Sequence, residues 1–476
     1  MNILDFTDYR KAFPLPKKAN KDYLDEVKLF KFIDNLLIDS GIEENVISQE
    51  LQNDGIKNAS SVKVQLYRRR FRINILMALK GEAFRTFEKN SACHDLRLWF
   101  TFYPKEFDKT FPGKSTLQRI SSSSSADHVK GIIHKAVALF SNEEVSSKFL
   151  GSGKEIVFNI LYGDSTSIEA NIHYPVDWLL ICDAVKSIIQ SIKVIRKNYF
   201  TYRIPDPDSF ITRINAHCIE MSATYHSKGA MGKRKKIVRK MFKLLSQVVS
   251  HGITYRKELL SCGIEGDKRA LLILKRLDNI LDQAPEILRI CRRRIISGKA
   301  IVNSEKILSL YDSDIHVIVR KKTGKRVEFG NGLYLCEQPQ GLILDWRFFK
   351  DQPPADSNLL QESLESISVR YGPVESFGGD RGFDSPTSRE YLDNASIFNA
   401  VARRSVKALR EQLNDKEFVK HQKRRAQTEG RISTVKHAFL KRVFRQRGFE
   451  NKERSVNWGI LVHNLCVFFR IKEEDK

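Results

Sequence analysis

The hydrophobic period of the chain changes along its length, and this change limits the folds that the chain can adopt. Apolar residues recur at helical spacing over residues 22–100 and again from Pro175 to about residue 300. From Ile315 the pattern becomes short β-rich runs, IHVIV, RVEFG, LYLCE and GLILDW, separated by the turn-forming segments TGK, GNG and QPQG. We therefore expect consecutive antiparallel strands after Ile315 in a chain that is otherwise mostly helical.

The helical region after Pro175 begins with a regular apolar stripe. Its members recur every three or four positions, which places them on one side of a helix that Asp177 is positioned to cap. They are Trp178, Ile181, Val185, Ile188 and Ile192. This stripe predicts a long amphipathic helix at the start of the region.

One more β-like segment lies upstream, in KEIVFNILYGDSTSIEANIHYP at residues 154–175. Its apolar run predicts a buried strand that ends at Gly163, so that Asp164 emerges at the strand end, where the clefts of α/β domains lie. A hairpin turn at Gly163-Asp164 is the alternative. We interpret His173, in the same segment, as a hydrogen-bonded structural histidine rather than a ligand.

Two further acids, Asp380 and Glu429, are candidates for the same site. Asp380 follows VESFGG and precedes Arg-Gly-Phe, where glycines permit close approach of the backbone to a ligand, although a plain turn has the same composition. Asp345, which ends GLILD, is the main alternative to Asp380 as the second metal ligand. Glu429 lies in KRRAQTEGRISTVKHAFLKR, where a helix of 100° per residue places Arg425 and Lys436 within about 40° of it.

The helix around Glu429 combines an apolar stripe, formed by Ile432, Val435 and Phe439, with strong positive charge. Residues 401–450 contain 15 Lys and Arg against 5 Asp and Glu, so Glu429 is nearly isolated among cations. Such a field attracts polyphosphate and keeps a carboxylate ionised. The alternative is an ordinary surface pair of Arg425 with Glu429, worth about 0.2–0.5 kcal/mol.

The charge of the whole chain indicates an anionic partner. It has 81 Lys and Arg against 57 Asp and Glu, a formal charge of +24, and nucleic acid is the first candidate. The cations concentrate in VKVQLYRRRFRINILMALKG, which contains Arg68, Arg69, Arg70 and Arg72, and in KGAMGKRKKIVRKMFK and RICRRRIISGK. FPGKSTLQRI has the small-residue turn and the Ser cap of the second helix of a helix-turn-helix. For each cluster a solvated surface is the alternative.

Several classes of protein are disfavoured. No apolar run reaches the roughly 18–20 residues of a membrane span, and the first residues, MNILDFTDYR, lack the apolar core of a signal peptide. The seven cysteines show no metal-binding or disulfide spacing. We expect a cytoplasmic protein.

Four pieces of the chain, in this order, resemble the DDE insertion-sequence transposases of bacteria. YGDSTSIEANIHYPVDWLLICDAVKSI matches the region of the first acid, and VEFGNGLYLCEQPQGLIL matches the strands that follow it. FGGDRGFDSP matches the second acid, and RRAQTEGRISTVKHAFLKRVFRQRGF with the distal WGILVHNLCVFFR matches the third. The similarity spans roughly residues 155–470. Where many relatives have a tyrosine before the basic signature, this chain has Gln422.

The resemblance implies a ribonuclease H-like catalytic domain over 151–476, with a helical insertion over about 178–310, preceded by a helical DNA-binding region over 1–150. It implies that Asp164, Asp380 and Glu429 are catalytic and hold two Mg²⁺ ions, with Mn²⁺ as a substitute. Arg425 and Lys436 would bind DNA phosphate.

The implied reaction is metal-dependent strand cleavage at the ends of a transposable element and strand transfer into target DNA. The partner is double-stranded DNA, and the protein acts as a homo-oligomer on DNA in the bacterial cytoplasm, at the nucleoid, without a membrane partner. Two alternatives stay open: a ribonuclease H-like structure-specific nuclease, and a domesticated DNA-binding protein without catalysis.

Overall fold

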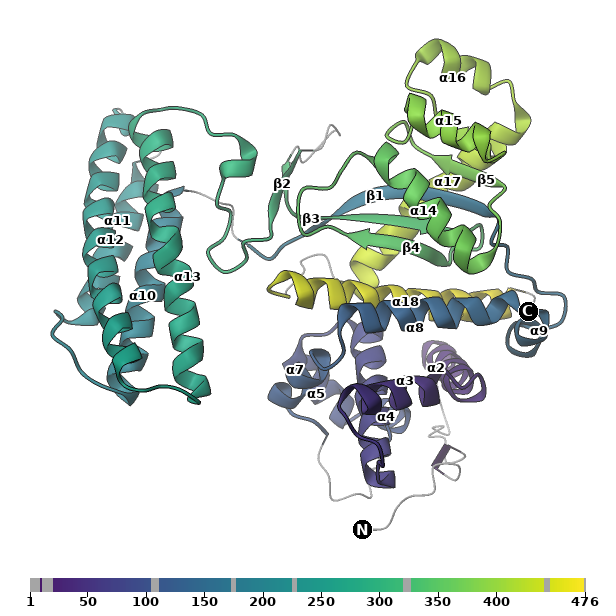
Figure 1. The fold of residues 1–476 in the computed structure, drawn as a ribbon, viewed down its shortest axis with the longest axis horizontal. Coiled ribbons are helices and arrows are strands. Elements are labelled where there is room, and N and C mark those ends of the chain that lie inside the picture. Colours follow the sequence, from purple (N-terminus) through teal and green to yellow (C-terminus); the bar gives the residue numbers. More distant parts are fainter. Residues whose placement is uncertain are drawn as a thin grey trace. The chain divides into compact units, whose positions relative to one another are not determined.

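The computed structural model describes residues 9–10, 20–103, 111–172, 177–224, 229–319, 327–440 and 446–474. Contacts divide the chain into two compact units, Met1–Glu169 with Asn331–Lys476 and, separately, Ala170–Gly330. The chain is mostly helical and contains a mixed sheet of six strands, which confirms the α/β class (Figure 1). None of the helices in these ranges has the length and apolarity to cross a bilayer.

The sheet combines parallel and antiparallel pairs. Its order is β2-β3-β1-β5-β6, and β4 pairs with β3. β1 is parallel to β5 and β5 is parallel to β6, whereas β3 is antiparallel to both β2 and β4. The strands are β1 (Ile160–Glu169), β2 (His316–Val319), β3 (Val327–Glu337), β4 (Ile343–Phe348), β5 (Ser376–Gly379) and β6 (Phe398–Val401).

Antiparallel strands after Ile315 are confirmed, but the turn predicted at Gly330-Asn331-Gly332 is wrong. β3 runs through these residues and pairs first with β2 and then, from Leu333, with β4. At the change of partner the Asn331 amide donates to the Phe349 carbonyl oxygen at 3.0 Å, so a side chain continues the hydrogen bonding. The predicted turn at 338–341 is present, with Gly341 at a φ of 98°.

The position of the first strand also differs from the prediction. β1 begins at Ile160 and continues to Glu169, so Asp164 lies within the strand rather than after it. Before Ile160, the Asn159 carbonyl oxygen accepts from the Ser376 amide nitrogen at 3.1 Å, and the amide nitrogen of Val157 donates to the side chain of Gln340 at 3.2 Å. The alternative of a hairpin turn at Gly163-Asp164 is therefore wrong as well.

Within the described residues, eight α-helices precede β1, and they share one hydrophobic core with the sheet and the last helix, α18 (Phe449–Glu473). By contacts, the predicted region 1–150 therefore belongs to the same compact unit as the sheet. The helices are α2 (Lys21–Asp39), α3 (Ile42–Asn53), α4 (Ser61–Lys80), α5 (Phe84–Ala92), α6 (Asp95–Phe100), α7 (Lys114–Ser121), α8 (Ala126–Ala138) and α9 (Glu143–Leu150).

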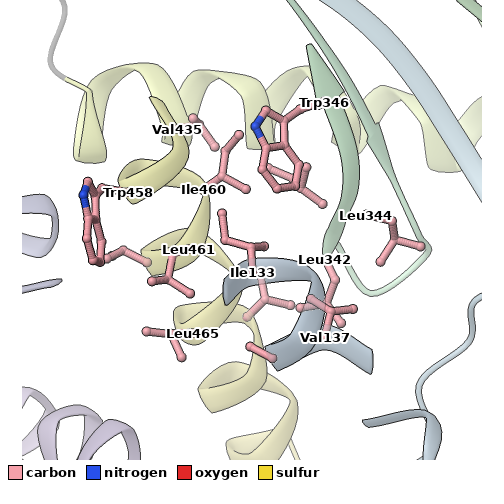
Figure 2. Packing of buried hydrophobic residues seen from close by; sticks show 14 of the residues in the cluster. Ile133, Val137, Leu342, Leu344, Trp346, Val435, Trp458, Ile460, Leu461 and Leu465 are labelled. Carbon is pink, nitrogen blue, oxygen red and sulfur yellow. The ribbon is translucent and has the colours of Figure 1, made fainter. Parts of the chain in front are cut away.

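α18 lies between the sheet and these helices, beside α8 (Figure 1). Figure 2 shows Ile133 of α8 and Leu461 of α18 in the packed layer next to Trp346 of β4. The Asn464 side chain accepts from the Ile343 amide nitrogen and donates to its carbonyl oxygen, both at 2.9 Å. Asn464 thus satisfies both backbone groups of the buried Ile343.

The helix-turn-helix prediction at FPGKSTLQRI fails in one detail. α7 is present, but its N-cap is Gly113 rather than a serine, and the Lys114 amide nitrogen donates to Glu88 Oε2 of α5 at 2.9 Å. The serine-rich stretch that follows is a short connection in which Ser125 caps α8 by accepting from the amide nitrogen of His128.

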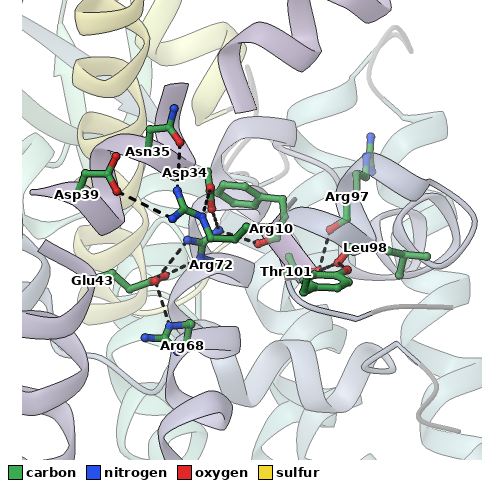
Figure 3. A network of polar contacts seen from close by, with 12 residues as sticks. Arg10, Asp34, Asn35, Asp39, Glu43, Arg68, Arg72, Arg97, Leu98 and Thr101 are labelled. Atoms are coloured by element: carbon green, nitrogen blue, oxygen red, sulfur yellow. Dashed lines mark hydrogen bonds and ion pairs between the residues drawn. The ribbon is translucent and has the colours of Figure 1, made fainter. Parts of the chain in front are cut away.

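The arginine-rich helix α4 turns two of its cations inward (Figure 3). Arg72 is fully buried and donates to Asp34 at 2.6 Å and to Glu43 at 2.5 Å. Arg68 bonds Glu43 at 3.1 Å. These arginines therefore stabilise the N-terminal helices, since a buried charge requires a partner of opposite sign.

The second unit is built on four helices, α10 (Asp177–Asn198), α11 (Pro207–Ala223), α12 (Ala230–Ser261) and α13 (Lys268–Cys291), and a π-helical turn, η2 (Arg292–Ile296). The predicted apolar stripe of α10 is buried against the other helices, which confirms that helix. Asp177 is the first residue of α10, and its carboxylate accepts a hydrogen bond from Arg294 of η2 at 2.6 Å. This acid therefore links the start of α10 to the turn after α13.

The remaining helices surround the second half of the sheet. α14 contacts β4 and β1, and α17 contacts β1, β5 and β6. They are α14 (Asp356–Tyr371), α15 (Pro386–Asn394), α16 (Val406–Gln412), α17 (Lys416–Thr434) and a π-helical turn, η4 (Val435–Phe439).

Candidate active site

Asp164 lies on β1, and Asp380 directly follows β5, the strand that pairs in parallel with β1. β1 and β5 pair in the register Ile160 with Ser376 and Tyr162 with Gly378. The same offset, continued two residues beyond the last pair, aligns Asp164 with Asp380, directly after β5 ends at Gly379. β5 ends there while β1 continues to Glu169, which leaves room for a ligand at the carboxyl end of β5 beside β1. Two acids more than 200 residues apart in the chain thus meet at one point of the sheet.

The electrostatics of Asp164 confirm this closeness. Burial raises the pKa of Asp164 to about 6, and the negative charge of Asp380 adds to the rise. The backbone N–H of Ser165 and the positive charge of Arg425 oppose it, and Glu429 contributes a smaller increase. Asp164 therefore lies within electrostatic range of both other predicted acids and of the predicted arginine.

The loop after β5 wraps around the Asp380 carboxylate. The Gly382 amide nitrogen donates to Asp380 Oδ1 at 2.7 Å. A Cβ at position 382 would lie 2.5 Å from Asp356 Oδ2 and 2.8 Å from Asp380 Oδ1, so a larger residue there would displace one or both carboxylates. Arg404 holds the loop by donating to the carbonyl oxygens of Arg381 and Gly382, at 2.9 and 3.1 Å.

Asp356, in the first turn of α14, is a carboxylate that sequence reasoning missed. Burial raises its pKa, a hydrogen bond from the Ser165 side chain lowers it, and the charge of Asp380 raises it. Asp356 thus neighbours both Asp380 and the residue after Asp164. No motif marks it, because it follows the polar segment DQPPA and resembles a residue at the start of a helix.

Glu429 is carried by α17, which packs against the parallel strands. Its side chain is exposed, whereas Arg425, one turn earlier, is half-buried. Arg425 Nε donates to the Gln422 side chain at 3.2 Å, and Gln422 Nε2 donates to the backbone oxygens of Gly379 and Ala400 at 3.2 and 2.6 Å. Gln422, the departure from the family pattern, thus ties Arg425 to the ends of β5 and β6.

The rotation of α17 is set on another of its faces. Glu337, buried at the end of β3, accepts from Arg424 at 3.1 Å, from Thr428 at 2.7 Å and from Arg431 at 3.1 Å. These three positions lie four and three residues apart, so one carboxylate binds three side chains of one helical face. This anchoring orients the face with Arg425 and Glu429 toward the parallel strands.

Lys436 reaches the same strand as the first acid. It lies in η4, directly after α17, and its Nζ donates to Thr166 Oγ1 at 3.3 Å. Thr166 is two residues after Asp164 on β1, and alternate residues of a strand share a face. The π-helical turn, which the uniform helical wheel did not predict, therefore still leaves Lys436 on the side of Asp164.

The other two candidates from the sequence lie elsewhere. Asp345 is buried on β4, where it accepts from Ser363 at 2.9 Å, and burial raises its pKa while Lys130 lowers it. These neighbours are distinct from those of Asp164, so Asp345 belongs to a different polar cluster. His173 lies outside the described residues.

The donor set suits a hard divalent cation, since carboxylate oxygens are the ligands that Mg²⁺ prefers and a cation would offset the repulsion between the charges of Asp164 and Asp380. In the conformations of the described residues, however, no three His, Cys, Asp or Glu side chains are grouped closely enough to hold one ion. The exposed Glu429 side chain would have to rotate toward Asp164 and Asp380 to complete a group of three.

A scan against protein-family models, a search of curated proteins and a search of solved structures each found no match. The family that the sequence suggests therefore stays a prediction. The functional argument rests on the residues and geometry of the chain itself.

Proposed function

We propose that this chain is a DDE transposase that cleaves DNA strands at the ends of a transposable element and transfers them into target DNA. The observation that carries the proposal is the closeness of Asp164, within β1, to Asp380, at the carboxyl end of the parallel strand β5, beside the helix that bears Glu429. Acids from three separate elements are what a metal-dependent phosphodiester reaction requires.

The arrangement of the sheet supports the ribonuclease H-like part of the proposal. An antiparallel region, β2, β3 and β4, adjoins the parallel strands β1, β5 and β6, and the first acid lies on β1. The helical unit Ala170–Gly330 stands in the chain between the first acid and most of the antiparallel strands, where the resemblance places an insertion.

In the proposed reaction Asp164, Asp380 and Glu429 hold the cations, and Asp356 adds negative charge beside Asp380. Divalent ions, when bound there, supply Lewis-acid activation of a water or 3′-hydroxyl and of the leaving oxygen. Arg425, fixed by Gln422, binds a phosphate through its planar guanidinium, and Lys436 adds a point charge on the same side.

The partners follow from this chemistry. The substrate is double-stranded DNA, both at the element ends and at the target, and the +24 formal charge of the chain favours its approach. We propose further that the protein works as a homo-oligomer on DNA at the bacterial nucleoid.

The test is nicking of a duplex that carries the end of its own element, with Mg²⁺. We expect the wild-type chain to nick and to join the 3′ end to a second duplex. Asp164→Asn, Asp380→Asn and Glu429→Gln should each abolish both steps, because each removes a charged ligand at nearly constant volume. Duplex binding should persist.

The matched control is Glu417→Gln, which changes an exposed acid in the first turn of the same helix and should leave nicking unchanged. Full nicking by any one of the three site variants would reject its assignment. Nicking without strand joining would favour the structure-specific nuclease. Duplex binding without nicking by the wild type under all divalent ions would favour the non-catalytic protein.

A further inference from the structure

Two basic segments of the helical unit, separated by about 50 residues, lie at the same end of its four helices. The helices follow one another with short connections and pack as neighbours, so α12 starts at the end where α13 finishes. The Arg292 guanidinium of η2 lies 5.9 Å from the centre of the Phe242 ring of α12. KRKKIVRKMFK and RRR, far apart in sequence, therefore form one surface.

The exposed face of α12 at this end is made of cations. Lys236, Arg239, Lys240 and Lys243 occupy positions i, i+3, i+4 and i+7, which share one side of a helix. All four are exposed, while the apolar residues of the same turns, such as Ile237 and Met241, are buried in the core. We name these four residues the α12 cationic face.

Nothing on α12 neutralises this face. Residues 230–257 contain no Asp or Glu. Throughout the described ranges, none of the four side chains forms an ion pair with a carboxylate, in contrast to Arg72 of α4. Like charges three and four residues apart repel each other along a helix. An anionic partner would remove this repulsion.

The groove beside η2 extends the positive surface. It is lined by Pro285, Arg292, Arg293 and Lys299, among others. The Arg293 guanidinium forms an ion pair with Glu305 at 3.5 Å. Arg292 and Lys299 are exposed at the same groove. The positive surface thus continues from one helix to the turn that follows its neighbour, which suits a long, regularly charged ligand better than a small anion.

We propose that the α12 cationic face, together with Arg292, binds the phosphate backbone of duplex DNA at a site distinct from the carboxylates. Duplex DNA carries a charge every 1.7 Å of its axis, so a row of four exposed cations contacts several phosphates without reading sequence. Phe242 is the one aromatic residue among residues 233–243, and it is partly buried with the Arg292 guanidinium 5.9 Å from its ring centre, which disfavours stacking of unpaired bases there. The inference rests on the proposed function, since that function brings DNA to the chain.

The test uses the full-length Asp164→Asn chain, which binds DNA without cutting it, and a duplex of arbitrary sequence. Affinity is measured from 50 to 300 mM salt. Replacing Lys236, Arg239, Lys240 and Lys243 by Gln should reduce the slope of log K against log salt by about 3–4, because each phosphate contact contributes about 0.9. Because all four side chains are exposed, this variant should keep the melting temperature of the Asp164→Asn chain.

Two matched variants make the result specific. The charge-retaining set, Lys236→Arg, Arg239→Lys, Lys240→Arg and Lys243→Arg, should keep the original slope. Replacing four exposed cations at the other end of the helices by Gln should change the slope by less than 1. These are Lys197, Lys257, Lys268 and Arg269.

An unchanged slope in the first variant would overturn the inference, and so would an equal fall in the control, which would reflect net charge alone. Retained duplex binding combined with lost binding to anionic phosphatidylserine vesicles would also overturn it and indicate a membrane surface. Failure of the proposed function alone would give a different result. The wild-type protein would then bind duplex DNA through this face but would not nick it.

Discussion

Two helices of this chain are similarly rich in cations but use them in opposite ways. On α4, Arg72 and Arg68 point inward and bind Asp34 and Glu43, which lie on the neighbouring helices α2 and α3. On α12, the cationic face points outward and has no acidic neighbour on its own helix. Charge density in a sequence therefore does not distinguish a structural cluster from a binding surface; the carboxylates on neighbouring elements do.

Helix α17 shows both uses on one element. Arg424 and Arg431 bind the buried Glu337, whereas Arg425 lies on the side of Asp164 and Glu429. The buried pairs orient the helix, and this orientation brings the remaining cation to the acids. The buried ion pairs and the proposed phosphate-binding cation thus lie on different faces of the same helix.

The strongest test of the comparison is Arg72→Met. Removing this guanidinium leaves Asp34 and Glu43 buried with one fewer partner each, and loss of one member of a buried ion pair costs about 3–5 kcal/mol. We expect a loss of about 3 kcal/mol, because Arg10 still bonds Asp34 and Arg68 still bonds Glu43. Chemical denaturation of the full chain measures it.

The matched substitution on the other helix is Lys240→Met, with the same change of residue class at an exposed site. It should alter the free energy of unfolding by less than about 0.5 kcal/mol. Equal losses for Arg72→Met and Lys240→Met would break the distinction between the two helices.

Replacing Asp164 should change the free energy of unfolding by a smaller amount and in the opposite direction, as a gain. The folded-state pKa of Asp164 is raised to about 6, above its ordinary value of 3.8, so its ionisation weakens the folded state as the pH rises from about 4 to 6. Asp164→Asn removes that cost. A rise of this size corresponds to at most about 3 kcal/mol, and partial exposure lowers the expected gain to about 1–2 kcal/mol at pH 7.5.

The pH dependence provides the control for this prediction. At about pH 3, wild-type Asp164 is mostly protonated in both the folded and the unfolded state, so the two proteins should unfold with similar free energies. A gain of the same size at about pH 3 and at pH 7.5 would mean that the effect arises from packing rather than from charge.

Much of the fold followed from the sequence because it depends on local periodicity. The stripe from Trp178 to Ile192 predicted α10, and the β-rich runs predicted β2 to β4. The continuous β3 was missed, since Gly330-Asn331-Gly332 forms a turn by local preference and a strand only when β2 and β4 supply partners. Tertiary pairing overrode local turn chemistry there.

The site was predictable only in part for the same reason. Asp164 and Asp380 could be named from their positions after apolar runs, but their alignment depends on the register of β1 with β5. Asp356 could not be found, because it reaches the site through packing of α14 and carries no local signal. The inward turn of Arg72 likewise depends on acids 29 and 38 residues away in the chain.

The most direct test of the central claim, that Asp164, Asp380 and Glu429 together hold divalent cations, is a calorimetric titration of the full-length chain with Mn²⁺ at pH 7.5. We predict that the wild-type chain binds the ion and releases a fraction of a proton, since binding requires ionised carboxylates. Asp164→Asn and Asp380→Asn should each lose this binding, while Glu417→Gln should keep it. Equal affinity for Mn²⁺ in the wild-type, Asp164→Asn and Asp380→Asn proteins would contradict the account.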